Sequence, residues 1–122
     1  MNIKTFGVVG AGQMGCGIAQ VAAASGLRVV LNDIREELVD KGIASIAARL
    51  ARVVAKRAMA AEERDALLGR IRRSMSIEDM SDADFVIEAA TENEPLKIKI
   101  FQDLDRNCRS GVILASNTSS IP

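Results

Sequence analysis

The sequence contains no histidine, no tryptophan and no tyrosine, and it has only three phenylalanines and two cysteines. So few aromatic rings argue against a surface that stacks nucleic-acid bases. Two cysteines without a Cys-x-x-Cys pair, in a chain without histidine, are too few for a zinc site, so we expect no metal. Sixteen basic residues balance sixteen acidic ones. This balance provides no general attraction to nucleic acid or to an anionic membrane.

Long apolar runs are missing as well. No stretch approaches the roughly 20 apolar residues that a membrane-spanning helix needs. Residues 1–4 lead directly into the first predicted strand, which leaves no room for a signal peptide. We therefore expect a cytoplasmic protein, and its 122 residues are enough for one domain with its own core.

The first pattern that is present is a strand, a turn and a helix near the N-terminus. The apolar run 6–9 breaks into glycines at Gly10, Gly12 and Gly15, which follow the G-x-G-x-x-G dinucleotide fingerprint. Glycines at this spacing allow a tight turn, a close approach to pyrophosphate and close packing of the helix on the strand. Helix N-terminal amides then face the phosphates. The expected dinucleotide site comprises Gly10, Ala11, Gly12, Gln13, Met14 and Gly15.

Asp33 follows the second predicted strand, residues 27–33, about 20 residues after the glycines. At this position a carboxylate accepts hydrogen bonds from the adenosine ribose and repels a 2′-phosphate, which favours NAD over NADP. An aspartate that only caps the next helix is the alternative. Arg35, close by, keeps NADP open as the cofactor.

Strands and helices alternate along the rest of the chain. This alternation predicts an α/β fold, a Rossmann-like parallel sheet with helices on both faces. Two helices instead of one join the second and third strands, so we predict an inserted helix pair. A turn or short helix is expected over 76–81. The predicted strands are 6–9, 27–33, 71–75, 84–90 and 111–115, and the predicted helices are 14–25, 36–57, 61–70 and one that opens near Pro95.

The helix 36–57 has two distinct faces. One is an apolar seam, and the other is a basic stripe that is either a solvated face or a landing surface for a phosphate-bearing substrate. The seam comprises Val39, Ile43, Ile46, Leu50 and Val53, and the stripe comprises Lys41, Ser45, Arg49, Arg52 and Lys56.

Three further residues need an interpretation. Glu88 lies inside a predicted strand, where a buried carboxylate needs a partner; we expect it to face the sheet edge or a neighbouring domain. Cys108 completes an apolar helix stripe with Leu96, Ile100 and Leu104, and it should pack as a small hydrophobic residue. Cys16 lies in the first turn of its helix, where packing is favoured over an activated thiol.

Polar residues follow the carboxyl ends of several predicted strands: the glycine turn, Asp33, Glu92 with Lys97, and residues 116–120. In an open parallel sheet this edge is where ligands bind. The coincidence predicts one site at this edge.

The blocks 10–20, 33–34, 86–93 and 113–120 resemble, in order, the signature blocks of the 3-hydroxyacyl-CoA dehydrogenases, most of all the short-chain, stand-alone bacterial members. The resemblance covers essentially the whole chain and implies NAD-dependent oxidation of the 3-hydroxyl of an acyl-CoA, or the reverse reduction. It implies that Asp33 holds the adenosine ribose and that Glu92 and Lys97 contact the nicotinamide-side ribose and phosphate region of the cofactor. It also implies that Ser119 hydrogen-bonds the substrate oxygen as a catalytic residue and that Asn117, a cofactor-binding residue, shapes the same pocket. Arg49, Arg52 and Lys56 would contact CoA.

The chain departs from the family in one respect. The family's general base is a histidine, oriented by a glutamate, that follows the Ser-Ser block, and this sequence has no histidine. The resemblance therefore implies that residues 1–122 are a truncated NAD-binding domain, nearly inactive alone, without the helical domain that completes the cleft and forms a homodimer. A non-catalytic NAD-binding module, which has no need of Ser119, and another β-hydroxyacid dehydrogenase are the alternatives.

Overall fold

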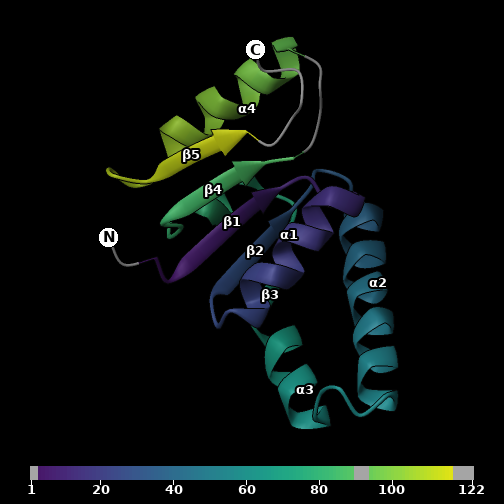
Figure 1. The fold of residues 1–122 in the computed structure, drawn as a ribbon. Coiled ribbons are helices and arrows are strands. Elements are labelled where there is room, and N and C mark those ends of the chain that lie inside the picture. Colours follow the sequence, from purple (N-terminus) through teal and green to yellow (C-terminus); the bar gives the residue numbers. More distant parts are fainter. Residues whose placement is uncertain (1–2, 90–93, 117–122) are drawn as a thin grey trace.

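The structure is a computed structural model of the chain and describes residues 3–89 and 94–116. Five strands alternate with four α-helices and one 3-10 helix in this part of the chain (Figure 1). In chain order the elements are β1 (Thr5–Val9), α1 (Gln13–Ala24), β2 (Arg28–Asn32), α2 (Glu36–Ala55), α3 (Ala61–Gly69), β3 (Ile71–Ser74), η1 (Ile77–Met80), β4 (Phe85–Glu88), α4 (Glu94–Asn107) and β5 (Ile113–Ser116).

The strands form a single parallel sheet in the order β3-β2-β1-β4-β5. The chain moves outward from β1 to β2 and β3, and it then returns to the other side of β1 for β4 and β5. Because all pairs are parallel, the carboxyl ends of the strands lie along one edge. The change of direction falls between β1 and β4, which is the position where open α/β sheets bind ligands. The predicted Rossmann-like parallel sheet is confirmed.

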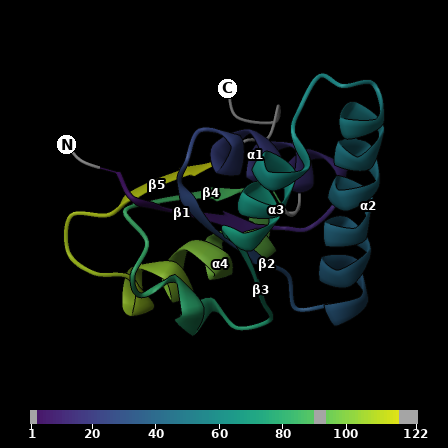
Figure 2. The same ribbon diagram turned by 90° about the horizontal axis from the view of Figure 1, so that it is seen from below.

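Helices cover both faces of the sheet. Figure 2 shows α4 on the side opposite α1 and α3, and two separate apolar clusters match these two sides. Strand side chains alternate between the clusters because successive residues of a strand point to opposite faces. The α1 side receives Val8, Val29 and Leu31, together with Val39, Ile46 and Leu50 of α2. The α4 side receives Val9, Val30, Val86 and Leu104.

Several predicted boundaries and contacts need correction. β5 begins at Ile113 instead of residue 111, because Gly111 has φ +87° and lies in the preceding turn. Ser116 ends β5 and does not start the following segment. Leu96 is 47% exposed, so only the later part of the α4 stripe packs on the sheet. The turn or short helix predicted over 76–81 is confirmed as a 3-10 helix, in which the Ser76 hydroxyl accepts from the N–H of Glu78 at 3.3 Å.

Within the described residues, none of the helices combines the length and the apolar character needed to cross a bilayer.

Candidate dinucleotide site

The glycine turn is anchored on the strands at either side of β1. The N–H of Gly10 donates to the carbonyl of Asn32 at the end of β2 (2.7 Å), and the carbonyl of Val9 accepts from the N–H of Ala89 after β4 (2.8 Å). Gly10 has φ 111°, a left-handed conformation that glycine adopts without strain. The turn therefore stands at the change of direction of the sheet, held from both sides.

The other two glycines of the fingerprint serve different purposes. A Cβ added to Gly15 would lie 1.7 Å from the carbonyl oxygen of Gly10, so only glycine lets α1 approach the turn this closely. A Cβ added to Gly12 would meet nothing within 4 Å. Gly12 is the N-cap of α1 and makes no side-chain capping bond. The open space beside Gly12 thus adjoins the N-terminal end of α1, which favours anionic groups.

The Asp33 side chain lies against the glycine turn. Its Oδ2 accepts from the N–H of Ala11 at 3.0 Å, and its Oδ1 accepts from the N–H of Arg35 at 3.0 Å. Arg35, not Asp33, is the N-cap of α2. The interpretation of Asp33 as a simple helix cap is therefore wrong. Arg35 itself is exposed and pairs with Glu37 (3.0 Å).

Cys16 is packed between α1 and α2. It is 4% exposed, and its Sγ donates to the carbonyl of Ala11 at 3.2 Å. A Cβ on Gly42 of α2 would lie 2.4 Å from this sulfur. Burial raises the pKa of the Cys16 thiol, and this effect outweighs the opposing charge of Arg49. The packing role is confirmed, and burial with a raised pKa disfavours an activated thiol.

A hollow of about 330 Å³ lies directly between the glycine turn and α2. It is distinct from a hollow of about 340 Å³ between α1 and α3, which lies away from the turn. Three residues of the basic stripe, Lys41, Ser45 and Arg49, line the hollow beside the glycine turn. Arg49 is held in place because its Nε donates to Gln20 (3.0 Å) and its Nη1 to Ser45 (2.9 Å). The walls of the hollow beside the glycine turn are formed by Ala11, Gly12, Gln13, Cys16, Leu38, Lys41, Gly42, Ser45 and Arg49.

The predicted basic stripe is thus divided. Arg52 and Lys56 are exposed and are not among the residues of this hollow. The sequence interpretation missed Gly42, whose lack of a side chain lets α2 approach Cys16. A glycine inside an otherwise strongly periodic helix was the signal that could have identified it.

The carboxyl ends of β4 and β5 contribute a buried carboxylate. Glu88 is 0% exposed, and the Ser116 hydroxyl donates to its Oε1 at 3.0 Å. Glu88 and Ser116 are register partners, and β4 is an interior strand between β1 and β5. Glu88 therefore has its partner inside the domain, and the expectation of an edge or a neighbouring domain is wrong.

The remaining predicted site residues are placed only in part. Lys97 lies in the first turns of α4 and is 6% exposed. Glu92, Asn117 and Ser119 lie outside the described residues. Among the described residues, the structure thus brings together the glycine turn, Asp33 and Arg49. The roles expected of Glu92, Asn117 and Ser119 stay predictions.

Comparison with known proteins gives a consistent result. A family model described as the NAD binding domain of 3-hydroxyacyl-CoA dehydrogenase matches residues 5–122. The chain is 46% identical over 119 residues to a 3-hydroxybutyryl-CoA dehydrogenase of Bradyrhizobium diazoefficiens, covering 98% of the chain and 41% of that protein. It is 43% identical over 122 residues to a probable 3-hydroxybutyryl-CoA dehydrogenase of Bacillus subtilis, covering 100% of the chain and 42% of that protein.

A solved structure supports the same assignment. The crystal structure of an (S)-3-hydroxybutyryl-CoA dehydrogenase from Ralstonia eutropha superposes with a TM-score of 0.94 at 48% identity, covering 98% of the chain and 42% of that protein. The chain thus spans about two fifths of the length of these relatives. The matched family model is an NAD binding domain, which indicates NAD as the cofactor.

Proposed function

Because this chain belongs to the 3-hydroxyacyl-CoA dehydrogenase family, we propose that it is the NAD-binding portion of an enzyme that transfers hydride between NAD and the 3-hydroxyl carbon of a short-chain acyl-CoA. The observation that carries the proposal is the bond from the Ala11 N–H to Asp33 Oδ2 (3.0 Å), which sets a carboxylate directly beside the glycine turn. The names of the relatives compared above support the same reaction.

In this proposal the backbone from Gly10 to Gly15 holds the pyrophosphate and Asp33 holds the adenosine ribose. Each Asp33 oxygen already accepts one backbone N–H, and each retains a second lone pair for a ribose hydroxyl. The negative charge of Asp33 would repel a 2′-phosphate at the same place. Arg35 is engaged with Glu37, which reduces its ability to neutralise that phosphate.

Arg49, Arg52 and Lys56 are proposed to contact the phosphates of CoA. The support is strongest for Arg49, which lines the hollow beside Gly12 and is fixed by Gln20 and Ser45. A fixed guanidinium loses little conformational freedom when it binds a phosphate. Arg52 and Lys56 extend the positive surface along α2 into solvent.

The chemical step needs residues beyond those placed here. Ser119 is proposed to hydrogen-bond the substrate oxygen and Asn117 to shape the same pocket, whereas Glu92 and Lys97 are proposed to contact the nicotinamide-side ribose and phosphate region of the cofactor. NAD, when bound, accepts or supplies the hydride. A general base accelerates such a step by roughly 100- to 10,000-fold, and this sequence has no histidine to act as one. We therefore propose that residues 1–122 alone are nearly inactive, and that the longer enzyme is a cytoplasmic homodimer assembled through a helical domain.

The cofactor assignment is tested by titrating the 122-residue chain with NADH and following its fluorescence. Asp33→Ala should raise the Kd about 10- to 100-fold, because hydrogen bonds to a charged group are lost. Asp82→Ala, which removes an exposed carboxylate elsewhere, is the control and should leave the Kd unchanged. Unchanged NADH binding in Asp33→Ala contradicts the assignment.

The substrate assignment is tested with free CoA. Arg49→Gln should weaken CoA binding, whereas Arg28→Gln, which removes an exposed charge at the opposite end of β2, should not. If CoA does not bind the unmodified chain at all, a non-catalytic NAD-binding module becomes the better interpretation. Turnover of acetoacetyl-CoA by the 122-residue chain at an ordinary enzymatic rate would contradict the proposed need for a further domain.

A further inference from the structure

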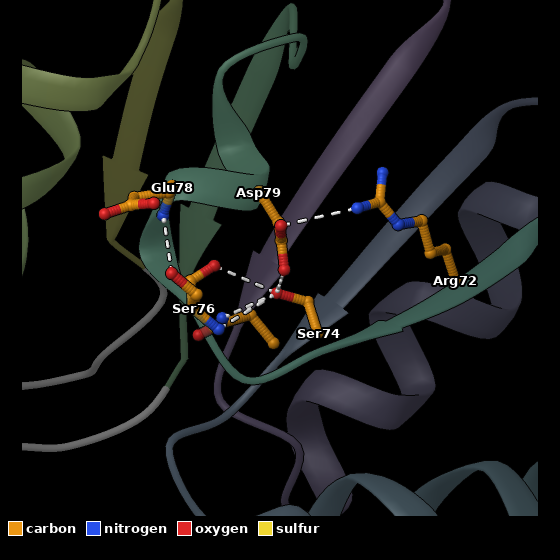
Figure 3. A network of polar contacts seen from close by, with 6 residues as sticks. Arg72, Ser74, Ser76, Glu78 and Asp79 are labelled. Atoms are coloured by element: carbon orange, nitrogen blue, oxygen red, sulfur yellow. Dashed lines mark hydrogen bonds and ion pairs between the residues drawn. The ribbon is translucent and has the colours of Figure 1, made fainter.

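A chain of polar side chains, buried at Asn32 and Ser74, joins the ends of β2 and β3 next to the glycine turn. Asn32 Nδ2 donates to Ser74 Oγ at 2.9 Å, and Ser74 Oγ lies 2.7 Å from Asp79 Oδ2. Arg72 Nη2 reaches the other oxygen of Asp79 at 3.3 Å. Figure 3 shows Ser74 close to Asp79 and Ser76, with Arg72 on the far side of Asp79. Asn32 and Ser74 are each 1% exposed.

The chain of hydrogen bonds has one direction. A serine hydroxyl has a single hydrogen, and Ser74 has two acceptors in reach, Asp79 Oδ2 at 2.7 Å and the carbonyl of Ser76 at 3.0 Å. The carboxylate is nearer and charged, so it receives the hydrogen. The Ser74 oxygen is then free to accept from Asn32. Amide, hydroxyl and carboxylate are thereby linked in sequence.

This arrangement is not needed to fill the core. Apolar side chains would occupy the same positions without burying polar groups. Hydrogen bonds, unlike apolar contacts, require specific distances and angles. The polar chain therefore sets the orientation of the end of β2 more narrowly than apolar packing would.

The same two residues hold the cofactor-binding elements through their backbones. The carbonyl of Asn32 accepts from the N–H of Gly10 at 2.7 Å, and the carbonyl of Ser74 accepts from the N–H of Asp33 at 3.1 Å. Asp33 then contacts the turn at Ala11. A shift of Asn32 against Ser74 would consequently move both Gly10 and Asp33.

We propose that Asn32 and Ser74 are positioning residues of the NAD site, whose side-chain hydrogen bond aims the Asp33 carboxylate at the 2′-hydroxyl of the adenosine ribose. The inference rests on the role proposed above for Asp33. Asn32 and Ser74 do not touch the cofactor. Their contribution is to the selectivity of the site for the ribose hydroxyl.

The test compares two ligands on the 122-residue chain by calorimetry: NAD, and an NAD analogue whose adenosine ribose lacks the 2′-hydroxyl. The unmodified chain should prefer NAD by about 10-fold, the value of one charge-assisted hydrogen bond. Ser74→Ala should reduce the preference for NAD over the analogue to less than about 3-fold. Val30→Ala, on the same strand and the same face of the sheet, removes core volume without touching the polar chain and should keep the full preference.

Asp33→Ala is measured in parallel and should lose the preference. If Asp33→Ala loses the preference for NAD and Ser74→Ala retains it, the positioning role of Asn32 and Ser74 is overturned while the role of Asp33 stands. If Asp33→Ala retains it, the assignment of Asp33 fails, and the inference fails with it. Should Ser74→Ala not fold, Asn32→Leu takes its place. Asn32→Leu replaces the amide by an apolar side chain of similar volume. Loss of the preference for NAD in this variant supports the positioning role, and a retained preference overturns it.

Discussion

Replacing Gly15 with alanine should damage both folding and cofactor binding. The added Cβ would lie 1.7 Å from the carbonyl oxygen of Gly10 and 2.9 Å from its carbonyl carbon. Real contacts of this kind stay beyond 3.0 Å, so the start of α1 must retreat by about 1.3 Å, from 1.7 to 3.0 Å. Gly10 cannot yield easily, because its N–H is bonded to Asn32. Overpacking of this kind costs about 1–3 kcal/mol of unfolding free energy.

NAD binding should also weaken in Gly15→Ala, by roughly 10-fold or more, because the backbone amides that we propose to face the pyrophosphate move with the helix. The matched control is Gly17→Ala in the same helix, where an added Cβ meets nothing within 4 Å. Alanine in a helix interior is favoured over glycine by about 0.8–1.0 kcal/mol. Gly17→Ala should therefore raise the melting temperature by ~3–6 °C for a domain of this size.

The two variants are measured by far-UV circular dichroism during heating and by NADH fluorescence titration at a temperature where both are folded. The expected result is opposite shifts of the melting temperature and a loss of NADH binding only in Gly15→Ala. A Gly15→Ala chain that melts no lower than the unmodified chain and binds NADH equally well would refute the close packing of α1 on the turn.

Three further predictions concern stability and reactivity. The Asp84 carboxylate accepts from the N–H groups of Lys4 and Thr5 and pairs with Arg109, which lowers its pKa to about 2 from 3.8. A carboxyl group whose pKa is lower in the folded chain stabilises the fold above its unfolded pKa, and this stabilisation is lost on acidification. Asp84→Asn should therefore lower the melting temperature at pH 6. It should also make the melting temperature fall less steeply between about pH 4 and pH 2. Burial and a raised pKa should make Cys16 label slowly with iodoacetamide at pH 8 until the chain is unfolded; rapid labelling of the folded chain, seen by mass spectrometry, would contradict this. Gly42→Ala should destabilise by about 1–3 kcal/mol, and by less in a Cys16→Ala background, which a double-mutant cycle by urea unfolding measures.

The glycine turn could be predicted from the sequence because its requirements are local. Gly10 needs a left-handed φ, and Gly15 needs the absence of a side chain, and both requirements are written in residue type and spacing alone. Gly26, at φ 94°, ends the α1 region for the same local reason. The parallel sheet follows from the alternation of short apolar strands with helices.

Contacts between distant strands could not be predicted in the same way. Glu88 accepts from Ser116, 28 residues further along the chain, and this contact depends on the register of β4 with β5. Leu96 shares the periodicity of Leu104 but is 47% exposed. Periodicity identifies residues on one face of a helix, whereas it does not determine how much of that face lies over the sheet.

Asp33 shows how the two kinds of information combine. Its spacing from the glycines suggested a ribose ligand, and its place before α2 suggested a helix cap. The structure adds a contact that neither pattern contains, the bond to Ala11 across 22 residues. The carboxylate therefore supports the turn before any ligand arrives, and it retains lone pairs for the ribose. It follows that Asp33→Ala removes the support of the turn together with the proposed ribose contact. The comparison of NAD with its 2′-deoxy analogue, and not the NAD affinity alone, separates the two contributions.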